Sequence, residues 1–224
     1  MKEKYALIFG HNDYTLEIKK NIVSEYEAVY VLSLEDESEN SFDLSDDWDT
    51  VDKKYKMKDC VAFCILEDMA ENIFLTISLR DTFKDLTIVA LAKDKEGADK
   101  LTLAGASRVL PTTQTTANVI VEMLEKPIVT EVLHNILYEE SDLKIAQIKI
   151  KNHELFDGKH LTDIDWSREH GIIVISVVHE DGSKEFIYSA KSKHHKIKMG
   201  DIFVVVGYEQ DIKDFEKLIG NKND

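Results

Sequence analysis

The residues with the clearest potential for ligand chemistry lie in the stretch Tyr5–Thr15, which reads YALIFGHNDYT. An apolar run ends at Gly10, polar residues follow, and a helix-periodic segment begins directly after them. A strand that turns at a glycine into a helix is a common cradle for phosphate groups, because the unpaired N–H groups of the helix point at the ligand. This arrangement makes four residues the candidate nucleotide-binding set: Gly10, His11, Asn12 and Asp13.

Two of the three glycines of a dinucleotide fingerprint are missing from this loop. Gly10 holds the first position, but Asn12 and Thr15 stand where the second and third glycines would be. Asparagine tolerates a left-handed backbone, yet its side chain narrows the space for a pyrophosphate. Asp13 can cap the helix, and its carboxylate would then use the helix N–H groups and repel a second anion. We therefore favour a scaffold that binds no dinucleotide.

Two acidic features that follow the loop could also bind a ligand. Glu35 and Asp36 lie about 25 residues after Gly10, where a ribose-binding carboxylate would be expected, so a nucleoside or weak nucleotide site stays open. The tract Glu35–Asp52 contains nine acidic residues and no basic one, and carboxylate oxygens suit hard cations. Because EF-hand spacing is missing, a solvated acidic loop is the simpler interpretation. The candidate cofactor is a nucleotide or a cation, with no dinucleotide favoured and no metal ligands assigned.

No residue pattern indicates catalysis. The sequence contains no nucleophile elbow, no metal-binding helix pair and no P-loop, so no enzymatic activity is expected. Cys60 and Cys64 share one apolar stretch and are interpreted as buried thiols rather than as a redox pair. His194 and His195 lie in the basic segment KSKHHKIK and are interpreted as part of a surface loop, with a pH sensor as the alternative.

Composition narrows the class of partner. The net charge of −15 argues against nucleic acid, because phosphate binding needs a basic surface. Hydrophobic residues make up 43% of the 224 residues, which is enough for a sizeable core. The longest apolar runs are too short to span a bilayer, and no signal peptide is recognised. These features predict a cytoplasmic location.

The elements that would position the loop alternate between strands and helices. Strands are predicted at residues 5–9, 28–34, 61–66, 86–92 and 107–110, and helices at about 13–26, 69–79 and 95–103. No element is predicted within residues 38–58, which are polar and acidic and then basic. The alternation predicts an α/β fold, a Rossmann-like doubly wound parallel sheet with helices on both faces.

The second half of the chain has a different pattern. A helical stretch from 113 to 138 is interrupted by Pro127, which should break it. Beyond an acidic boundary come strands at 143–150, 171–179, 184–188 and 202–206 and helices at 158–168 and 209–219. The Asp181-Gly182 step between two of these strands favours a hairpin. We predict a Rossmann-like domain at 1–112, a crossover helix pair at 113–141 and a small α+β domain at 142–224.

Three stretches, in this order, resemble an RCK domain (regulator of K+ conductance), the paired TrkA-N and TrkA-C modules of potassium channels and transporters. LIFGHNDYTLEIKKNI resembles the first strand, loop and helix. IVALAKDKEGADKLTLAGASRVLPTTQTTANVIVEML resembles the segment that leads through AGA-x-x-V-x-P into the crossover helix. FDGKHLTDID and KMGDIFVVVGYEQDIKDFEKL resemble the C-terminal module. The resemblance covers about residues 4–220.

The resemblance implies a cytosolic, ligand-sensing gating-ring domain that controls K+ flux through a prokaryotic potassium channel. It further implies a homodimer formed through the crossover helices, an octameric ring, and a pore at the inner face of the cell membrane as the partner. A free-standing nucleotide-binding subunit of a Trk/Ktr-type K+ transporter is the alternative. An NAD-dependent oxidoreductase would need an intact fingerprint and a catalytic residue, and the sequence shows neither.

Two departures from the family pattern lead to further expectations. Glu35 and Val61 are separated by fewer residues than the family uses for a helix, a strand and another helix, so one of these elements should be shortened or lost. In calcium-gated members, carboxylates at the ends of the fourth and fifth strands bind the ion. The matching positions here are Ile65, Leu91 and Lys93, none of which is a carboxylate. We therefore expect this calcium site to be absent.

Overall fold

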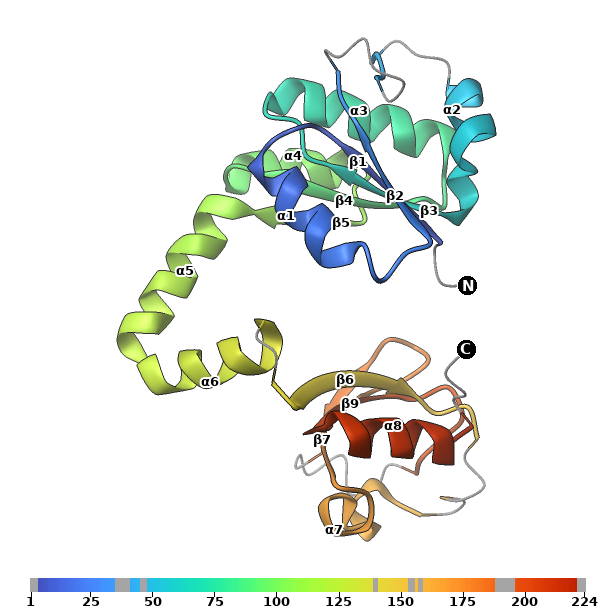
Figure 1. Cartoon of the computed structure of the whole chain (residues 1–224), viewed down its shortest axis with the longest axis vertical. Helices are drawn as coiled ribbons and strands as arrows, with labels where there is room; N and C mark the ends of the chain where they lie inside the picture. The colour runs from blue at the N-terminus through green and yellow to red at the C-terminus, as the bar shows by residue number, and fades with distance from the viewer. Residues whose placement is uncertain are drawn as a thin grey trace. The chain divides into compact units, whose positions relative to one another are not determined.

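The structure is a computed structural model that describes residues 4–34, 41–44, 48–138, 141–152, 156, 159–187 and 196–220. The chain divides into two compact units, Met1–Glu122 and Met123–Asp224, which follow one another along the colour ramp of Figure 1. Each unit has its own sheet and its own hydrophobic core.

The first unit is built on a five-stranded parallel sheet in the order β2-β1-β3-β4-β5. Its strands are β1 (Tyr5–Phe9), β2 (Ala28–Leu32), β3 (Cys60–Cys64), β4 (Thr87–Ala92) and β5 (Arg108–Pro111). β1 pairs with β2 on one side and with β3 on the other, so the order of the strands reverses between β1 and β3. In an open parallel sheet, such a reversal opens a crevice at the carboxyl ends of the strands.

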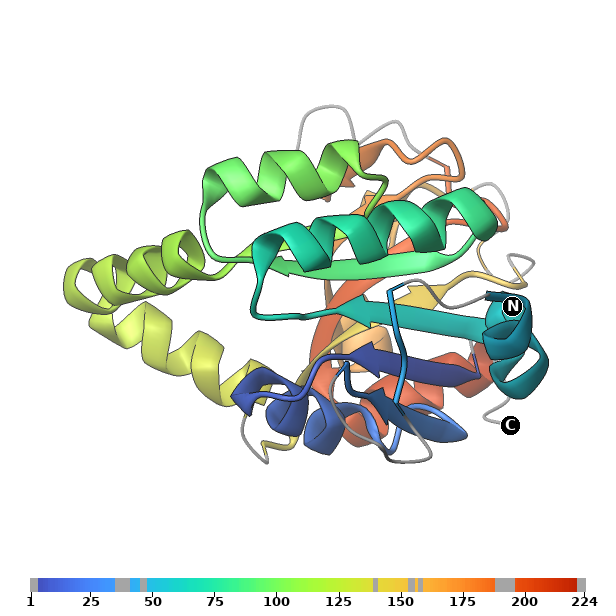
Figure 2. The same ribbon diagram turned by 90° about the horizontal axis from the view of Figure 1, so that it is seen from above.

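Helices cover both faces of this sheet, which confirms the predicted doubly wound α/β fold. α1 (Asp13–Ile22) lies on one face, and α3 (Met69–Thr82) and α4 (Lys95–Leu103) lie on the other (Figure 2). α2 (Trp48–Tyr55) joins the α3 side, where the indole N–H of Trp48 donates a hydrogen bond of 2.6 Å to Ser78 Oγ. A short 3-10 turn, η1 (Met57–Asp59), leads from α2 into β3.

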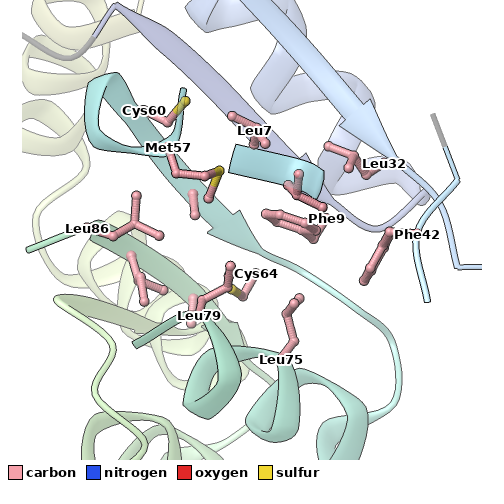
Figure 3. Packing of buried hydrophobic residues seen from close by; sticks show 14 of the residues in the cluster. Leu7, Phe9, Leu32, Phe42, Met57, Cys60, Cys64, Leu75, Leu79 and Leu86 are labelled. Carbon is pink, nitrogen blue, oxygen red and sulfur yellow. The ribbon is translucent and has the colours of Figure 1, made fainter. Parts of the chain in front are cut away.

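The core of the first unit lies between the sheet and the helices α2, α3 and α4. Leu7 and Phe9 of β1 meet Leu75 and Leu79 of α3 there (Figure 3), and all four are fully buried. Burial of one such side chain contributes about 1.5–3 kcal/mol to folding. Cys64 belongs to the same core. The strands β1, β2 and β3 were predictable because each is an uninterrupted apolar run.

Among the described residues between β2 and β3, a parallel bridge joins Ser33 to Ser41, and the Phe42 N–H donates a hydrogen bond of 3.0 Å to Ser33 O. The expected shortening or loss of an element in this segment stays a prediction. The sequence left the fold of residues 38–58 open, and α2 lies there. Its buried residues, Trp48, Val51 and Tyr55, repeat at helical spacing among charged neighbours.

Two consecutive helices follow β5. α5 (Thr112–Glu125) and α6 (Pro127–Tyr138) are separate, and the interruption predicted at Pro127 is confirmed. Proline suits the first position of a helix, where its missing N–H is not needed. Within the described residues, neither helix contains a buried side chain, and no helix of this part of the chain is long and apolar enough to cross a membrane.

The second unit is an antiparallel sheet in the order β6-β9-β7-β8. Its elements are β6 (Leu143–Lys149), η3 (Leu161–Asp163), α7 (Trp166–His170), β7 (Ile172–Val178), β8 (Lys184–Phe186), β9 (Ile202–Tyr208) and α8 (Glu209–Leu218). The predicted hairpin joins β7 to β8, with Gly182 at a φ of +79° in its turn. The helix predicted at 158–168 is wrong, because η3 and the five-residue α7 divide that region.

Candidate functional site

The loop after β1 is held against the end of β3. Gly10 has a φ of +129°, and a Cβ there would lie 2.7 Å from the carbonyl oxygen of Ile65. The Gly10 N–H donates a hydrogen bond of 2.9 Å to Leu32 O, and the Ile65 N–H donates one of 3.0 Å to Phe9 O. The position therefore requires glycine for two reasons, its backbone angle and its contact with β3.

Asn12 closes the N-terminus of α1 through a reciprocal pair of hydrogen bonds. The Thr15 N–H donates to Asn12 Oδ1 at 3.2 Å, and the Asn12 N–H donates to Thr15 Oγ1 at 3.2 Å. The side-chain amide of Asn12 also donates to Ile65 O at 2.8 Å. The capping residue is therefore Asn12 rather than Asp13, which was the sequence-based expectation, and Asn12 is extended (φ −152°) rather than left-handed.

The capping pair changes what the loop can bind. One helix N–H group, that of Thr15, is bonded to the Asn12 side chain, and the N–H of Asn12 itself is bonded to Thr15 Oγ1. Asp13 adds a carboxylate to the first turn of the helix, which opposes a bound anion. His11 lies exposed in the same loop, whereas Glu35 and Asp36 lie outside the described residues. The sequence-based assignment of the loop as a weak or degenerate nucleotide site stays a prediction.

A cavity of about 540 Å³ opens beside this loop, at the carboxyl ends of β1, β3, β4 and β5. Its walls are Asn12, Asp13 and Tyr14 after β1, Ile65, Leu66, Glu67 and Met69 after β3, Leu91, Ala92 and Lys93 at β4, and Thr112 and Thr113 after β5. The size is within the usual range for small-molecule sites. The cavity also lies where the strand order predicts a ligand crevice.

The three positions that the sequence analysis matched to calcium ligands of the family lie in this cavity, because Ile65, Leu91 and Lys93 all line it. The match itself stays a prediction. The side chains of these three residues supply two aliphatic groups and a cation, a set that does not suit Ca²⁺. Across the described residues, no group of three or more His, Cys, Asp or Glu side chains is placed to hold a metal ion.

Asn72 of α3 bonds to the strand ends that border the cavity, and the sequence analysis did not recognise this role. Its side-chain amide donates hydrogen bonds to Cys64 O at 3.2 Å and to Leu91 O at 3.0 Å, and its Oδ1 accepts from the Leu66 N–H at 3.2 Å. The side chain is fully buried. Asn72 thus fixes the spacing of β3 and β4 where they end at the cavity. A polar residue within the apolar stripe of a predicted helix was the available signal.

The helices that start on this edge of the sheet are capped by their own carboxylates. Asp68 accepts hydrogen bonds from the N–H groups of Ala70 and Glu71 at 2.8 and 3.0 Å at the start of α3. Asp94 accepts from the Gly97 N–H at 2.8 Å at the start of α4. Together with the Asn12 cap, these contacts occupy the N–H groups of Thr15, Ala70, Glu71 and Gly97, which leaves fewer helix-end donors for a polyphosphate.

Comparisons with known proteins identify both units. A family model for the TrkA-N domain matches residues 50–112, and a family model for the TrkA-C domain matches residues 145–220. The chain is an RCK domain. The first strand and the loop with Gly10 and Asn12 precede the range that the TrkA-N model matches, so the family models do not cover this loop.

Potassium channel proteins are similar to this RCK domain in sequence. It is 26% identical over 155 residues to potassium channel protein 1 of Methanocaldococcus jannaschii, and 27% identical over 159 residues to probable potassium channel protein 2 of the same organism. These matches cover 69% and 68% of the chain but 45% of each relative. The chain therefore spans about half the length of the curated relatives it matches.

The fold of the RCK domain is also found in a solved gating ring. The human SLO3 gating ring matches 94% of the chain and 46% of that structure, with a TM-score of 0.66 and 9% sequence identity. At this identity, the similarity establishes the fold and leaves the ligand of the cavity to be inferred from its own residues.

Proposed function

We propose that this RCK domain is a cytosolic regulatory module of a gating ring that controls K+ flux through a prokaryotic potassium channel at the inner face of the membrane. The observation that carries the proposal is the pairing of TrkA-N and TrkA-C modules in one chain that is similar in sequence to two potassium channel proteins. Its role is regulatory rather than catalytic.

The crossover helices supply a surface for a second copy of the chain. Apolar side chains are exposed on both helices: Ile120, Met123 and Leu124 on α5, and Val129, Val132 and Leu133 on α6. Contiguous apolar surface of this kind usually marks a protein interface. We assign it to a homodimer in which the helices of the two copies bury one another.

A closed ring needs a second, different contact surface on each copy. The helices α3 and α4 offer one, because Phe74, Ile77 and Leu103 are exposed there and Leu103 is 88% accessible. Lys84 and Lys100 stand beside a groove that Ile77 and Leu103 line. Two apolar surfaces on separate helices support assembly beyond a dimer, with the octamer as the proposed ring.

Regulation would follow from a shift between two arrangements of the paired domains. A ligand that binds one arrangement more tightly than the other changes their populations by its difference in affinity. The cavity beside Asn12 lies in the first unit, and the separate helices α5 and α6 connect this unit to the second. The ring would transmit this shift to the pore.

Sedimentation velocity over a range of chain concentrations tests the assembly. We expect a dimer at low concentration and a larger closed species at high concentration. The double variant Ile120→Glu/Leu133→Glu should lower the mass to that of a monomer, because it places charges within the dimer surface. Val23→Glu is the matched control, since Val23 is equally exposed but lies after α1. A chain that is monomeric at every concentration overturns the proposal.

A further inference from the structure

We propose that the cavity beside Asn12 binds a zwitterion whose ammonium and carboxylate are separated by a short chain, such as a dipeptide. This inference rests on the proposed function in that it takes this cavity as the regulatory site of the RCK domain. It assigns the ligand from the charges, the apolar surface and the size of the cavity.

One side of the cavity carries negative charge. Asp13 stands in the first turn of α1, directly after β1, and Glu67 follows β3. β1 and β3 are neighbours in the sheet, so both carboxylates belong to the same half of the cavity. Carboxylates in this position attract an ammonium group and repel a phosphate.

The opposite side carries positive charge and hydroxyl groups. Lys93 follows β4, and Thr112 and Thr113 follow β5. The Thr112 hydroxyl donates to Ala92 O at 3.2 Å, and the Thr113 N–H donates to Lys93 O at 3.2 Å. These bonds fix the backbone that carries the lysine. The Lys93 ammonium and the Thr113 hydroxyl belong to residues that line the same cavity, and both groups can donate to a carboxylate.

The strand order places Asp13 and Lys93 two strands apart, after β1 and β4, whereas Glu67 follows β3, the neighbour of β4. The sheet runs β1-β3-β4-β5 across the cavity, with roughly 4.8 Å between neighbouring strands. Within the described part of the chain, neither Asp13 nor Glu67 forms an ion pair with Lys93. The cavity thus holds opposite charges that do not neutralise one another, and a ligand with two separated charges can pair with both.

Apolar side chains form the surface between the charges. Ile65, which is buried, lies beside Met69 and Leu91 in the wall. Such a surface favours a ligand with an apolar body. A cavity of about 540 Å³ accommodates a dipeptide, and the capped helices disfavour a nucleotide of similar size.

Isothermal titration calorimetry of the whole chain with glycyl-leucine tests the ligand class. N-acetyl-glycyl-leucine lacks the ammonium and glycyl-leucinamide lacks the carboxylate, and we expect each to bind about tenfold or more weakly than glycyl-leucine. Equal binding of the three compounds, no binding of glycyl-leucine, or tighter binding of ADP would overturn the proposal.

Protein variants identify the contacts. In Lys93→Gln, amidation of the ligand should no longer weaken binding, because the carboxylate has lost its partner. In Asp13→Asn/Glu67→Gln, acetylation of the ligand's ammonium should no longer weaken binding, because the ammonium has lost its partners. Lys95→Gln is the control, since Lys95 is an exposed residue of α4 outside the cavity wall. Variants that retain the same preferences as the wild type would refute this assignment of contacts.

Sedimentation in the same samples separates this inference from the proposed function. A chain that assembles but does not bind glycyl-leucine overturns the ligand and leaves the gating-ring function standing. A chain that binds glycyl-leucine but stays monomeric overturns the ring and leaves the ligand site standing.

Discussion

The side-chain amide of Asn12 donates a hydrogen bond of 2.8 Å to the backbone carbonyl of Ile65, 53 residues further along the chain. This bond joins the loop after β1 to the end of β3. These are the two strands between which the strand order of the sheet reverses. One side chain therefore caps α1, fixes the loop and forms part of the cavity wall. In this loop, a side chain with three hydrogen-bonded contacts therefore stands where a dinucleotide fingerprint has its second glycine.

Replacement of Asn12 should show how much the contacts of its side chain contribute to the free energy of unfolding. Asn12→Ala removes the cap and the bond to Ile65, and each contributes about 1 kcal/mol. We expect the free energy of unfolding to fall by about 2 kcal/mol in urea denaturation. Asn12→Asp keeps a capping oxygen but loses the donor, so its loss should be smaller. Asn21→Ala, at an exposed position of α1, should be nearly neutral, and a loss of equal size there would contradict this account.

Asn72 should be more sensitive than its helical position suggests. Asn72→Ala leaves the carbonyls of Cys64 and Leu91 and the N–H of Leu66 without their buried partner. We expect a loss of about 2–4 kcal/mol, because unsatisfied buried groups carry their full desolvation cost. Thr76→Val, one turn further and also buried, removes the bond of its hydroxyl to Asn72 O within the helix and its contact with the Cys64 thiol, but no bond to a strand-end backbone group. Comparable losses for the two variants would show that Asn72 does not hold the strands.

The two cysteines should be unreactive in the folded chain. Burial raises the pKa of the Cys60 and Cys64 thiols to about 12, from an ordinary value of 9.0, so the reactive thiolate is scarce at pH 8. We expect slow labelling by a maleimide until the chain is unfolded in urea. Rapid labelling of the native chain would contradict the interpretation of both residues as core thiols.

The same pKa shift predicts how stability depends on pH. The folded state holds the thiol protons more tightly than the unfolded state, so the cysteines stabilise the fold fully below pH 9 and lose this contribution as the pH rises towards 12. In Cys60→Ala/Cys64→Ala, the fall in unfolding free energy between these pH values should be shallower than in the wild type. The same pH dependence of the unfolding free energy in the variant and the wild type would refute the raised thiol pKa.

His170 should make the second unit less stable in acid. Burial lowers the pKa of His170, whose ring packs 5.2 Å from the ring of Phe215. The unfolded state therefore binds the proton more tightly, and the contribution of His170 is complete above its unfolded pKa, about 6.5, and declines below it. Unfolding followed by Trp166 fluorescence should show a smaller decrease from pH 7.5 to pH 5 in His170→Gln. An equal decrease in stability in the variant and the wild type would show that His170 does not cause the loss of stability in acid.

The strands β1 to β4 were predictable because each is mostly a run of apolar residues, from Tyr5–Phe9 to Thr87–Ala92. α2 was missed because three buried side chains are dispersed among acidic and basic ones, and helix periodicity is weak over eight residues. The cavity was not predicted, because its walls lie at the ends of four strands whose order only the structure gives. The role of Asn72 could not be predicted either, because its side chain bonds to strand ends that are distant in sequence.

The choice of cap at α1 shows the same limit. Asn12 and Asp13 both have side chains that can cap a helix, and their order in the sequence does not say where the helix begins. The contact with Ile65, 53 residues away, favours Asn12, since only an amide can donate to that carbonyl while its oxygen accepts from Thr15. Tertiary structure therefore decided a feature that local sequence left open.

The crossover helices have a consequence for how the molecule responds to dilution. α5 and α6 are 14 and 12 residues long, and within the described residues neither contains a buried side chain. Isolated helices of this length are marginal in water, so in the proposed homodimer most of their stability would come from the second copy of the chain. Folding of the two helices and self-association would then be one equilibrium. In that dimer, the connection between the two units would become rigid only at chain concentrations that allow association.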